Sequence, residues 1–228
     1  MKWDEVYSSV SANAGTKVWV DTTIPEVERF ANSLSRNASV LDAGCGEGRQ
    51  TQVLLASGVQ EIVCCDGSSV ALLNLLTHIQ DGSSKVNIAQ CELSDLYFRD
   101  SMFDAAISID ALVHNTFENT VKVLNELSRC VRVGGRFLFN LCTSDEPVRK
   151  LDGMTEVGEL TSTYYSEALD SKFLYEFYDE NRLEQLISSS DLQSNDVSVV
   201  RSRWLESPHP GFRNYDHEHD GWFVTVHL

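Results

Sequence analysis

The sequence predicts an α/β fold in which a mostly parallel, doubly wound sheet carries helices on both faces. Between about residues 38 and 142, short apolar runs with strand character alternate with segments whose apolar residues recur at helical spacing. Parallel strands require a crossover between them, and the helical segments supply it. A glycine-rich turn follows the first apolar run, at the edge where such sheets bind ligands.

Seven runs are expected to form the strands of this sheet, because they are short, apolar and bounded by turn residues. They are Val40–Asp42, Glu61–Asp66, Val86–Gln90, Phe103–Ile109, Arg136–Leu141, Val197–Trp204 and Trp222–His227. Helices are expected at 48–57, 68–78, 120–131 and 181–189, the second of them capped by Ser68 or Ser69. Residues 143–175 are polar, and we expect them to be irregular.

Composition places the chain among ordinary globular proteins, with 42% hydrophobic and 23% charged residues. No apolar run approaches the roughly 18–20 residues that span a bilayer. The start of the chain lacks the apolar segment of a signal peptide, so a cytoplasmic location is expected. The 6 cysteines form no C-x-x-C pair, which favours buried free thiols over disulfides or a zinc site.

The charge balance is strongly acidic. The chain carries 34 acidic and 18 basic residues, for a net charge of −16. Such a surface repels phosphate backbones and anionic membranes. We therefore expect neither nucleic acid nor a membrane as partner.

The glycine turn is the most informative stretch. Residues 40–51 read Val-Leu-Asp-Ala-Gly-Cys-Gly-Glu-Gly-Arg-Gln-Thr. Glycines after a strand allow a close ligand approach, and the next helix directs free N–H groups at the ligand. The dinucleotide fingerprint G-x-G-x-x-G fails in both registers, because Arg49 or Thr51 occupies its last position. The phosphate-binding pattern G-x-x-x-x-G-K-[ST] is absent from the sequence.

The segment Val-Leu-Asp-Ala-Gly-Cys-Gly-Glu-Gly resembles the first motif of the class I S-adenosylmethionine-dependent methyltransferases. Further segments follow in the order of that family: Asp66, Cys91–Leu96, Phe103-Asp104 and Leu127–Arg136. The resemblance covers roughly residues 38–142. It implies a Rossmann-like sheet of seven strands with an antiparallel last strand. It also implies S-adenosyl-L-methionine as cofactor and S-adenosyl-L-homocysteine as product.

The resemblance also implies a cofactor site. The backbone of the loop Gly44, Cys45, Gly46 and Gly48 would cradle the methionine part of the cofactor. Asp42 would orient this loop and reach the amino group. Asp66, followed by Gly67, would bind the ribose.

The adenine end of the cofactor is assigned to Glu92, which would meet the amino group of the base, and to Leu93 beside the ring. Glu92 stands where the family usually has Asp, and Cys91 where it usually has Gly. Asp110 and Ala111 would line the methionine tail.

Histidines supply the candidate catalytic groups. His209, His217 and His219 lie in one loop among acidic residues, and the last two share a face of an extended chain. They could act as general base, bind a metal or be solvated; we assign no metal. His114 follows the fourth strand and is a second candidate base, or a histidine satisfied by backbone.

Aromatic and basic residues supply the candidate substrate site. Trp3 and Tyr7 lie one helical turn apart and could close over the site, or pack in the core. Tyr164 and Tyr165 could line a pocket or pack under a lid. Arg203 and Arg213 could hold a substrate carboxylate or form surface ion pairs.

Together these features predict a single methyltransferase domain over 1–228. Its parts are a helical cap (1–35), a cofactor-binding core (36–142), a substrate lid or insertion (143–180) and a C-terminal helix with a strand hairpin (181–228). Asp110–Val113 occupies the place of the [D/N]-P-P-[Y/F] signature of methylases that act on adenine or glutamine.

A small-molecule acceptor with an O, N or S nucleophile is expected, in a monomer or homodimer. The alternatives are methylation of RNA or protein, a non-catalytic cofactor-binding scaffold, and a nicotinamide-dependent oxidoreductase, which the glycine spacing disfavours.

Overall fold

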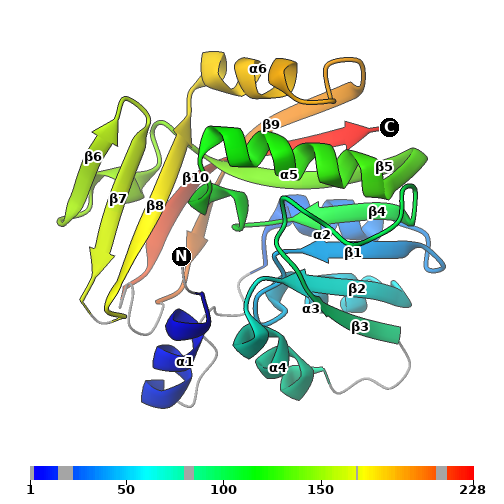
Figure 1. Cartoon of the computed structure of the whole chain (residues 1–228), viewed down its shortest axis with the longest axis horizontal. Helices are drawn as coiled ribbons and strands as arrows, with labels where there is room; N and C mark the ends of the chain where they lie inside the picture. Colours follow the sequence, from blue (N-terminus) through cyan, green and yellow to red (C-terminus); the bar gives the residue numbers. More distant parts are fainter. Residues whose placement is uncertain (1–2, 15–22, 80–84, 168, 209–214) are drawn as a thin grey trace.

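The computed structural model describes residues 3–14, 23–79, 85–167, 169–208 and 215–228 (Figure 1). One central sheet runs through the molecule, and a smaller side sheet continues from it. No described helix combines the length and apolar character that a membrane span requires.

The central sheet has the strand order β3-β2-β1-β4-β5-β10-β9. Strands β1 to β5 are mutually parallel, and β10 is antiparallel to both β5 and β9. This confirms the predicted seven-stranded sheet with an antiparallel last strand. The strands are β1 (Ser39–Ala43), β2 (Glu61–Asp66), β3 (Lys85–Gln90), β4 (Phe103–Ser108), β5 (Val131–Thr143), β9 (Asp196–Glu206) and β10 (His217–His227).

The helices form where the sequence predicts them, and polar side chains set three of their starts. Ser68 accepts from the backbone N–H of Ala71 at 3.1 Å and caps the helix after β2, as predicted. Thr116 and Asp179 cap two later helices in the same way. The helices are α1 (Trp3–Ala14), α2 (Pro25–Asn32), α3 (Arg49–Ala56), α4 (Ser69–His78), α5 (Phe117–Cys130) and α6 (Glu180–Ser189), with short turns η1 (Leu112–His114) and η2 (Pro147–Lys150).

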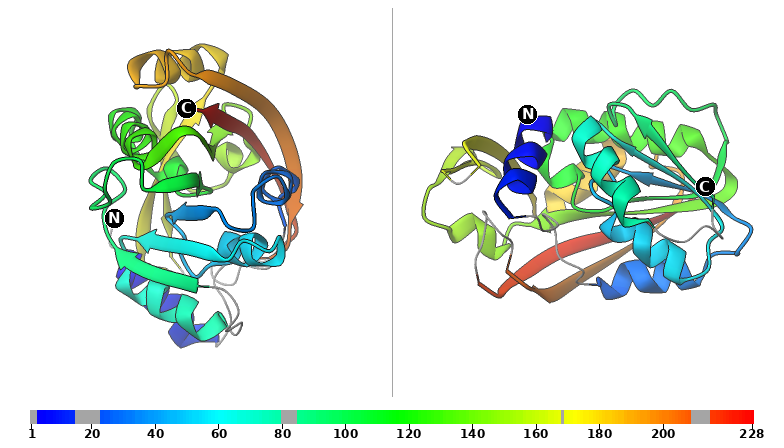
Figure 2. Two further views of the ribbon diagram at one scale, coloured as in Figure 1. Left: turned by 90° about the vertical axis from the view of Figure 1, so that its right-hand side faces the viewer. Right: turned by 90° about the horizontal axis from the view of Figure 1, so that it is seen from below.

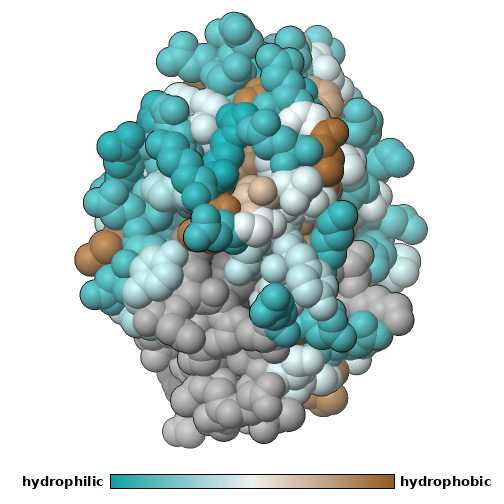
Figure 3. Space-filling model, turned by 90° about the vertical axis from the view of Figure 1, so that its left-hand side faces the viewer, coloured by the Kyte–Doolittle hydropathy of each residue, from teal (hydrophilic) through white to brown (hydrophobic). Residues whose placement is uncertain are grey.

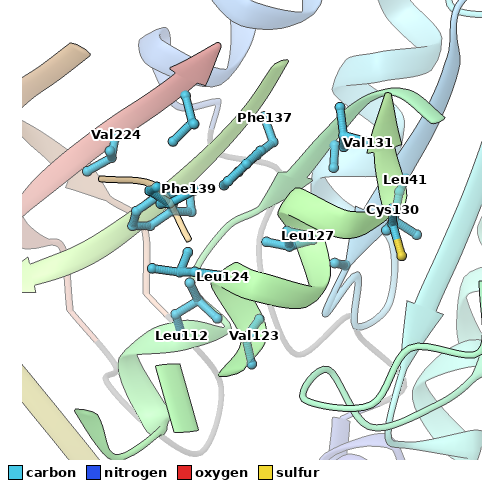
Figure 4. Close-up of a cluster of buried hydrophobic side chains, with 14 of the residues drawn as sticks. Leu41, Leu112, Val123, Leu124, Leu127, Cys130, Val131, Phe137, Phe139 and Val224 are labelled. Carbon is cyan, nitrogen blue, oxygen red and sulfur yellow. The ribbon is translucent and has the colours of Figure 1, made fainter. Parts of the chain in front are cut away.

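Helices cover both faces of the central sheet. Figure 2 shows α5 on one face and α2 and α3 on the other. On the first face, α5 and α6 pack on β-strand side chains from β1, β5 and β10. Figure 4 shows this cluster, including Leu124, Leu127, Phe137, Phe139 and Val224. Each fully buried side chain of this size stabilises the fold by roughly 1.5–3 kcal/mol.

The opposite face holds a second cluster, in which α2, α3 and α4 cover alternate side chains of β1, β2 and β4. Both faces of these strands are therefore dry, as expected for parallel strands between helix layers. Five cysteine thiols lie buried and free in the structure, and Cys142 is half-buried, in accord with the sequence.

The prediction that residues 143–175 are irregular is wrong. They contain η2 and the strands β6 (Met154–Gly158), β7 (Thr161–Ser166) and most of β8 (Ser171–Tyr178). These strands form an antiparallel side sheet, and β8 joins the end of β5 through Cys142–Phe177 and Thr143–Tyr178 pairs. The alternation of buried Phe173, Tyr175 and Phe177 was the missed strand signal.

One face of the side sheet is covered by other parts of the protein, and much of the other face is exposed to solvent. A third cluster, built from α1, α4 and β8, buries the inner side of β8. Figure 3 shows the left-hand side of the molecule in Figure 1, where β6 and β7 lie, and the part of that face that it colours by hydropathy is mostly hydrophilic. The side sheet therefore brings α1 and the central sheet together without exposing a broad apolar surface.

Candidate functional site

A cavity of about 570 Å³ lies at the carboxyl ends of the parallel strands. This is the edge where α/β sheets bind ligands. Gly48, although described, lies at the start of α3 rather than on the cavity wall. The other predicted cofactor residues all line the cavity: Asp42, Gly44, Cys45, Gly46, Asp66, Gly67, Glu92, Leu93, Asp110 and Ala111.

The glycine loop is held closely by neighbouring parts of the protein. Gly44 and Gly46 have φ angles of +77° and +53°, which L side chains rarely adopt. A Cβ on Gly44 would lie 2.4 Å from the Cβ of Ala111, and one on Gly46 would lie 2.6 Å from the hydroxyl of Tyr7. The glycines therefore let the loop pass close to η1 and α1 as well as to the cavity.

Asp66 ties this loop to the start of α4. Its carboxylate accepts from the backbone N–H of Gly46 at 2.9 Å and from that of Ser68 at 2.8 Å. Burial raises the pKa of Asp66, and the two backbone hydrogen bonds oppose that shift. A carboxylate has about four acceptor positions, so capacity remains for hydroxyl donors in the cavity.

Asp42 is the most deeply buried carboxylate of the loop, with 1% of its surface exposed. The hydroxyl of Thr51 donates to it at 2.7 Å. Burial raises the pKa of Asp42 to about 7, although the Thr51 hydrogen bond acts in the opposite direction. An acid group held so far from its ordinary range suggests a ligand that supplies the missing positive charge.

Asp110 is fixed at the end of β4 in a left-handed conformation, with φ +58°. Asn140 holds it twice: the side-chain oxygen of Asn140 accepts from the Asp110 backbone N–H at 2.7 Å, and its amide donates to the carboxylate at 2.6 Å. Arg49 donates to the other carboxylate oxygen and also to Glu206. This network joins the glycine loop, β4, β5 and β9 around the cavity.

The helix α1 forms the roof. Trp3 and Tyr7 both line the cavity, and the ring of Trp3 lies 5.3 Å from that of His114. Asp4 anchors the helix, because its carboxylate accepts from the Ser68 hydroxyl at 2.7 Å and the Val70 backbone N–H at 3.2 Å. Trp3 and Tyr7 thus lie over the site and also pack against neighbouring side chains, so both roles considered for them from the sequence apply.

His114 lies in η1 between α1 and β8. Its Nδ1 lies 2.8 Å from the carbonyl oxygen of Leu174, which can only accept, so Nδ1 carries the proton. Burial lowers the pKa of His114, and the hydrogen bond to Leu174 acts in the opposite direction. The neutral ring thus keeps its lone pair on Nε2, in a side chain that lines the cavity.

His217 and His219 line the far end of the same cavity, together with Glu146 and Glu206. Nδ1 of His219 lies 3.0 Å from Glu146, and Nε2 lies 2.7 Å from Glu206. Burial lowers the pKa of His219, but the two carboxylates outweigh it and raise the pKa to about 9. His209, the third histidine of the predicted group, lies outside the described residues.

Of the remaining substrate candidates, the three that the structure describes do not line this cavity. Among the described ones, Tyr164 packs against the α1–β8 cluster, and Tyr165 is half-exposed and donates to Asp170. Arg203 is occupied on the sheet surface by an ion pair of 2.8 Å with Asp220. Arg213 lies outside the described residues.

Sequence reasoning missed several residues of the wall. They are Arg49, Glu146, Tyr175, Trp204 and Glu206. Arg49 directly follows the glycine loop and Glu206 ends a strand, which are the signals that could have found them. The other three needed the missed side sheet or the strand register.

Known proteins resemble this chain over its central part. The methyltransferase domain family matches residues 41–139. The tRNA (carboxymethyluridine(34)-5-O)-methyltransferase alkbh8 of Xenopus tropicalis is 31% identical over 134 residues, covering 57% of this chain and 19% of that protein. The tRNA (carboxymethyluridine(34)-5-O)-methyltransferase of Arabidopsis thaliana is 31% identical over 144 residues, covering 63% and 33%. The chain thus spans only 19% to 33% of the length of these two relatives.

A solved structure extends the likeness to nearly the whole fold. The Burkholderia thailandensis 1,6-didemethyltoxoflavin-N1-methyltransferase, with bound 1,6-didemethyltoxoflavin and S-adenosylhomocysteine, has a TM-score of 0.61 and 22% identity. The match covers 98% of this chain and 88% of that chain. Residues 41–139 thus match a methyltransferase domain, and the sheet order with its antiparallel β10 is the fold that the chain shares with solved class I S-adenosylmethionine-dependent methyltransferases.

Proposed function

We propose that the protein transfers the methyl group of S-adenosylmethionine to an O, N or S atom of a small-molecule acceptor. The observation that carries the proposal is the roofed cavity of about 570 Å³, closed by α1 above the glycine loop and walled by β8. Its size lies within the range of small-molecule sites, roughly 300–1,000 Å³.

The chemistry of the walls fits the cofactor. S-adenosylmethionine carries a cationic amino group and a sulfonium, and its methyl group is electrophilic when bound. The buried carboxylates Asp42 and Asp66 offer negative charge beside the glycine loop, and both have raised pKa values that a cationic ligand would reverse. Glu92 and Leu93 line the same cavity and are assigned to the adenine end.

The charge of the walls disfavours a nucleic-acid acceptor. Arg49 is the one arginine or lysine among the described residues that line the cavity, and Asp110 and Glu206 already hold it. The net charge of −16 repels phosphate groups from the rest of the surface. Small neutral or cationic acceptors suit these walls better.

His114 is the general base of this proposal. A base must be neutral to accept a proton, and the lowered pKa of His114 keeps it neutral throughout the physiological range. His219 is less suitable in the free protein, because its pKa of about 9 leaves it protonated at neutral pH. The chain itself has only to align the acceptor with the methyl group and exclude water.

Methylation of RNA is the second candidate, since two relatives at 31% identity are named as tRNA methyltransferases. The test is release of S-adenosylhomocysteine from purified protein supplied with S-adenosylmethionine and, separately, small-molecule, RNA and protein fractions of a cell extract. We expect release with the small-molecule fraction. Release with RNA or protein alone would contradict the proposed acceptor, and cofactor binding without any release would favour a scaffold.

A variant tests the proposed base with the acceptor found in this way. His114→Gln should lower kcat about 100-fold or more while cofactor affinity is unchanged. His227→Gln is the matched control, because His227 is exposed at the far end of β10. Equal rates for both variants would remove His114 from the proton transfer.

A further inference from the structure

The β9–β10 hairpin gathers two imidazoles and a carboxylate that the proposed methyl transfer does not use. His217 pairs directly with Glu206 across the hairpin, so both side chains lie on one face of the sheet. His219 is two residues further along β10 and shares that face. We call Glu206, His217 and His219 the hairpin triad. Their ligand atoms all lie within 4.8 Å of one another.

The hydrogen bonds of both rings direct Nε2 toward the carboxylate. Nδ1 of His217 lies 3.0 Å from the carbonyl oxygen of Tyr215, and Nδ1 of His219 lies 3.0 Å from Glu146. With the proton on Nδ1, each neutral ring has its lone pair on Nε2. These Nε2 atoms lie 3.9 Å and 2.7 Å from Oε2 of Glu206.

The two carboxylate oxygens of Glu206 have different partners. Its other oxygen, Oε1, accepts from Arg49, which leaves Oε2 facing the two histidines. Metal-binding histidines commonly donate their second N–H to a carboxylate or a backbone carbonyl, and both arrangements occur here. The triad thus has the inner ligands and also the outer hydrogen bonds of a metal site.

Burial and charge favour a cation at this place. Glu206 is 4% exposed, Glu146 is 1% exposed and His217 is 6% exposed. Glu146, Glu206 and Asp110 bring three carboxylates to this end of the cavity, against the single guanidinium of Arg49. Two imidazoles and one carboxylate form the ligand set of many catalytic zinc sites.

We infer that the hairpin triad binds one divalent transition-metal ion of the Zn²⁺ class through Nε2 of His217, Nε2 of His219 and Oε2 of Glu206. A tetrahedral zinc site has metal–ligand distances of about 2.0–2.2 Å, which place ligand atoms roughly 3.3–3.6 Å apart. Ligand atoms at the 4.8 Å limit therefore have to approach by about 1.2–1.5 Å, and the 2.7 Å contact of His219 with Glu206 has to open by less than about 1 Å. His217 and Glu206 lie at strand ends beside the hairpin loop, where such an adjustment is small compared with the fold.

Three protein ligands leave a coordination position open, and the triad lines the cavity. A water molecule or a heteroatom of the acceptor would occupy that position. This role toward the acceptor rests on the proposed function, whereas metal binding itself does not. The two are therefore tested by separate measurements.

The metal is tested on the full chain after chelator treatment, without cofactor or acceptor, at about pH 8, where a bound metal ion displaces the proton from each ligating imidazole nitrogen. Zn²⁺ is titrated in competition with a chromophoric chelator, and Co²⁺ serves as a spectroscopic probe. We expect one metal ion per chain and the visible absorption of four- or five-coordinate Co²⁺. Absence of saturable Zn²⁺ binding by the wild-type protein, or a Co²⁺ spectrum like that of the free ion, would overturn the inference.

Three variants locate the ion. His219→Ala should weaken Zn²⁺ binding by about 100-fold or more. Glu146→Gln removes the outer carboxylate that meets Nδ1 of His219 and the backbone N–H of Asp220, and should weaken binding by roughly 10–100-fold. His227→Ala, on the same strand but away from the triad, should bind as the wild type does. Equal affinity of all three variants would place the metal elsewhere and overturn the assignment; the wild-type Co²⁺ spectrum decides the matter should His219→Ala not fold.

Discussion

At the scale of single residues, the site contains groups that are poorly suited to the free protein. Asp42 is an acid in a buried place, with a pKa raised to about 7. Its hydrogen bond from Thr51 is too weak to offset burial. Residues that are unfavourable for stability concentrate at functional sites, and we propose that the amino group of the cofactor is the partner of Asp42.

Asp42→Asn should stabilise the ligand-free protein at neutral and alkaline pH. The folded pKa of about 7 lies above the ordinary value of 3.8, so ionisation of Asp42 opposes folding, and this loss of stability develops as pH rises from about 4 to about 7. The variant lacks the loss and should gain on the order of 2–4 kcal/mol above pH 7, and little near pH 4. Urea unfolding across this pH range measures the difference.

The same substitution should weaken cofactor binding, because Asn cannot supply negative charge to a cationic amino group. Asp66 also has a raised pKa, so part of the pH dependence will remain in the variant. A variant that is less stable than the wild type at pH 8 would show that the Asp42 carboxylate is not opposed to folding.

At the scale of elements, Asp4 makes several of the polar contacts that hold α1 to the rest of the fold. Asp4 belongs to α1, and its carboxylate contacts the first residues of α4. Its negative charge there also interacts favourably with the positive end of the α4 helix dipole. Hydrogen bonds from Ser68, Ser69 and Val70 lower the pKa of Asp4, opposed slightly by burial. The exposed carboxylate of Asp4 thus helps to hold α1 in place over the cavity, beside the buried side chains of α1.

Asp4→Ala should therefore loosen the roof. We expect cofactor to dissociate roughly 3- to 10-fold faster, since hydrogen bonds of this kind contribute about 1 kcal/mol each. Stopped-flow displacement of bound S-adenosylhomocysteine measures the rate. Ser8→Ala, an exposed position on the same helix, is the control. Identical dissociation rates in the two variants would mean that α1 does not restrain the ligand.

The sequence was sufficient for elements with strong local signals. The strand Glu61–Asp66 has the predicted bounds, and Ser68 caps α4 as expected. It was insufficient for β6 to β8, because polar residues, some of them buried like Ser162 and Glu176, interrupt the alternation of the buried aromatics. Polar content suggested a loop where one face of a sheet is simply exposed.

The sequence indicates those cavity residues that directly follow the parallel strands. The glycine loop, Asp66 and Glu92 follow strand ends in order, and parallel strands bring those ends to one edge. Glu146 and Glu206 could not be found in this way. They reach His219 only through the pairing of β10 with β5 and β9, which depends on contacts between distant parts of the chain.

At the scale of the whole molecule, the charge of −16 acts against compactness, because like charges repel each other more strongly in the folded state. Several ion pairs oppose this, including Arg132–Asp104 and Lys85–Glu61, but exposed pairs contribute little each. We therefore expect the repulsion among the excess acidic residues to destabilise the fold by more than these exposed ion pairs stabilise it.

Added salt should raise the melting temperature. Between about 0.02 M and 0.5 M NaCl the screening length falls to a few ångströms, which removes most of the repulsion between distant charges. We expect a rise of several degrees in calorimetry or circular dichroism, with the same shift in KCl. A fall would show that the ion pairs dominate, and a difference between the two salts would indicate specific ion binding.

The cavity has a floor and a roof from different parts of the chain. The floor, where the cofactor is assigned, belongs to the strand ends and is tied together by Asp66, Asp110 and Arg49. The roof belongs to α1 and the side sheet, through Trp3 and Tyr175, whose rings both pack against His114. Acceptor preference can therefore diversify by substitutions in the roof while methyl-donor chemistry is inherited unchanged.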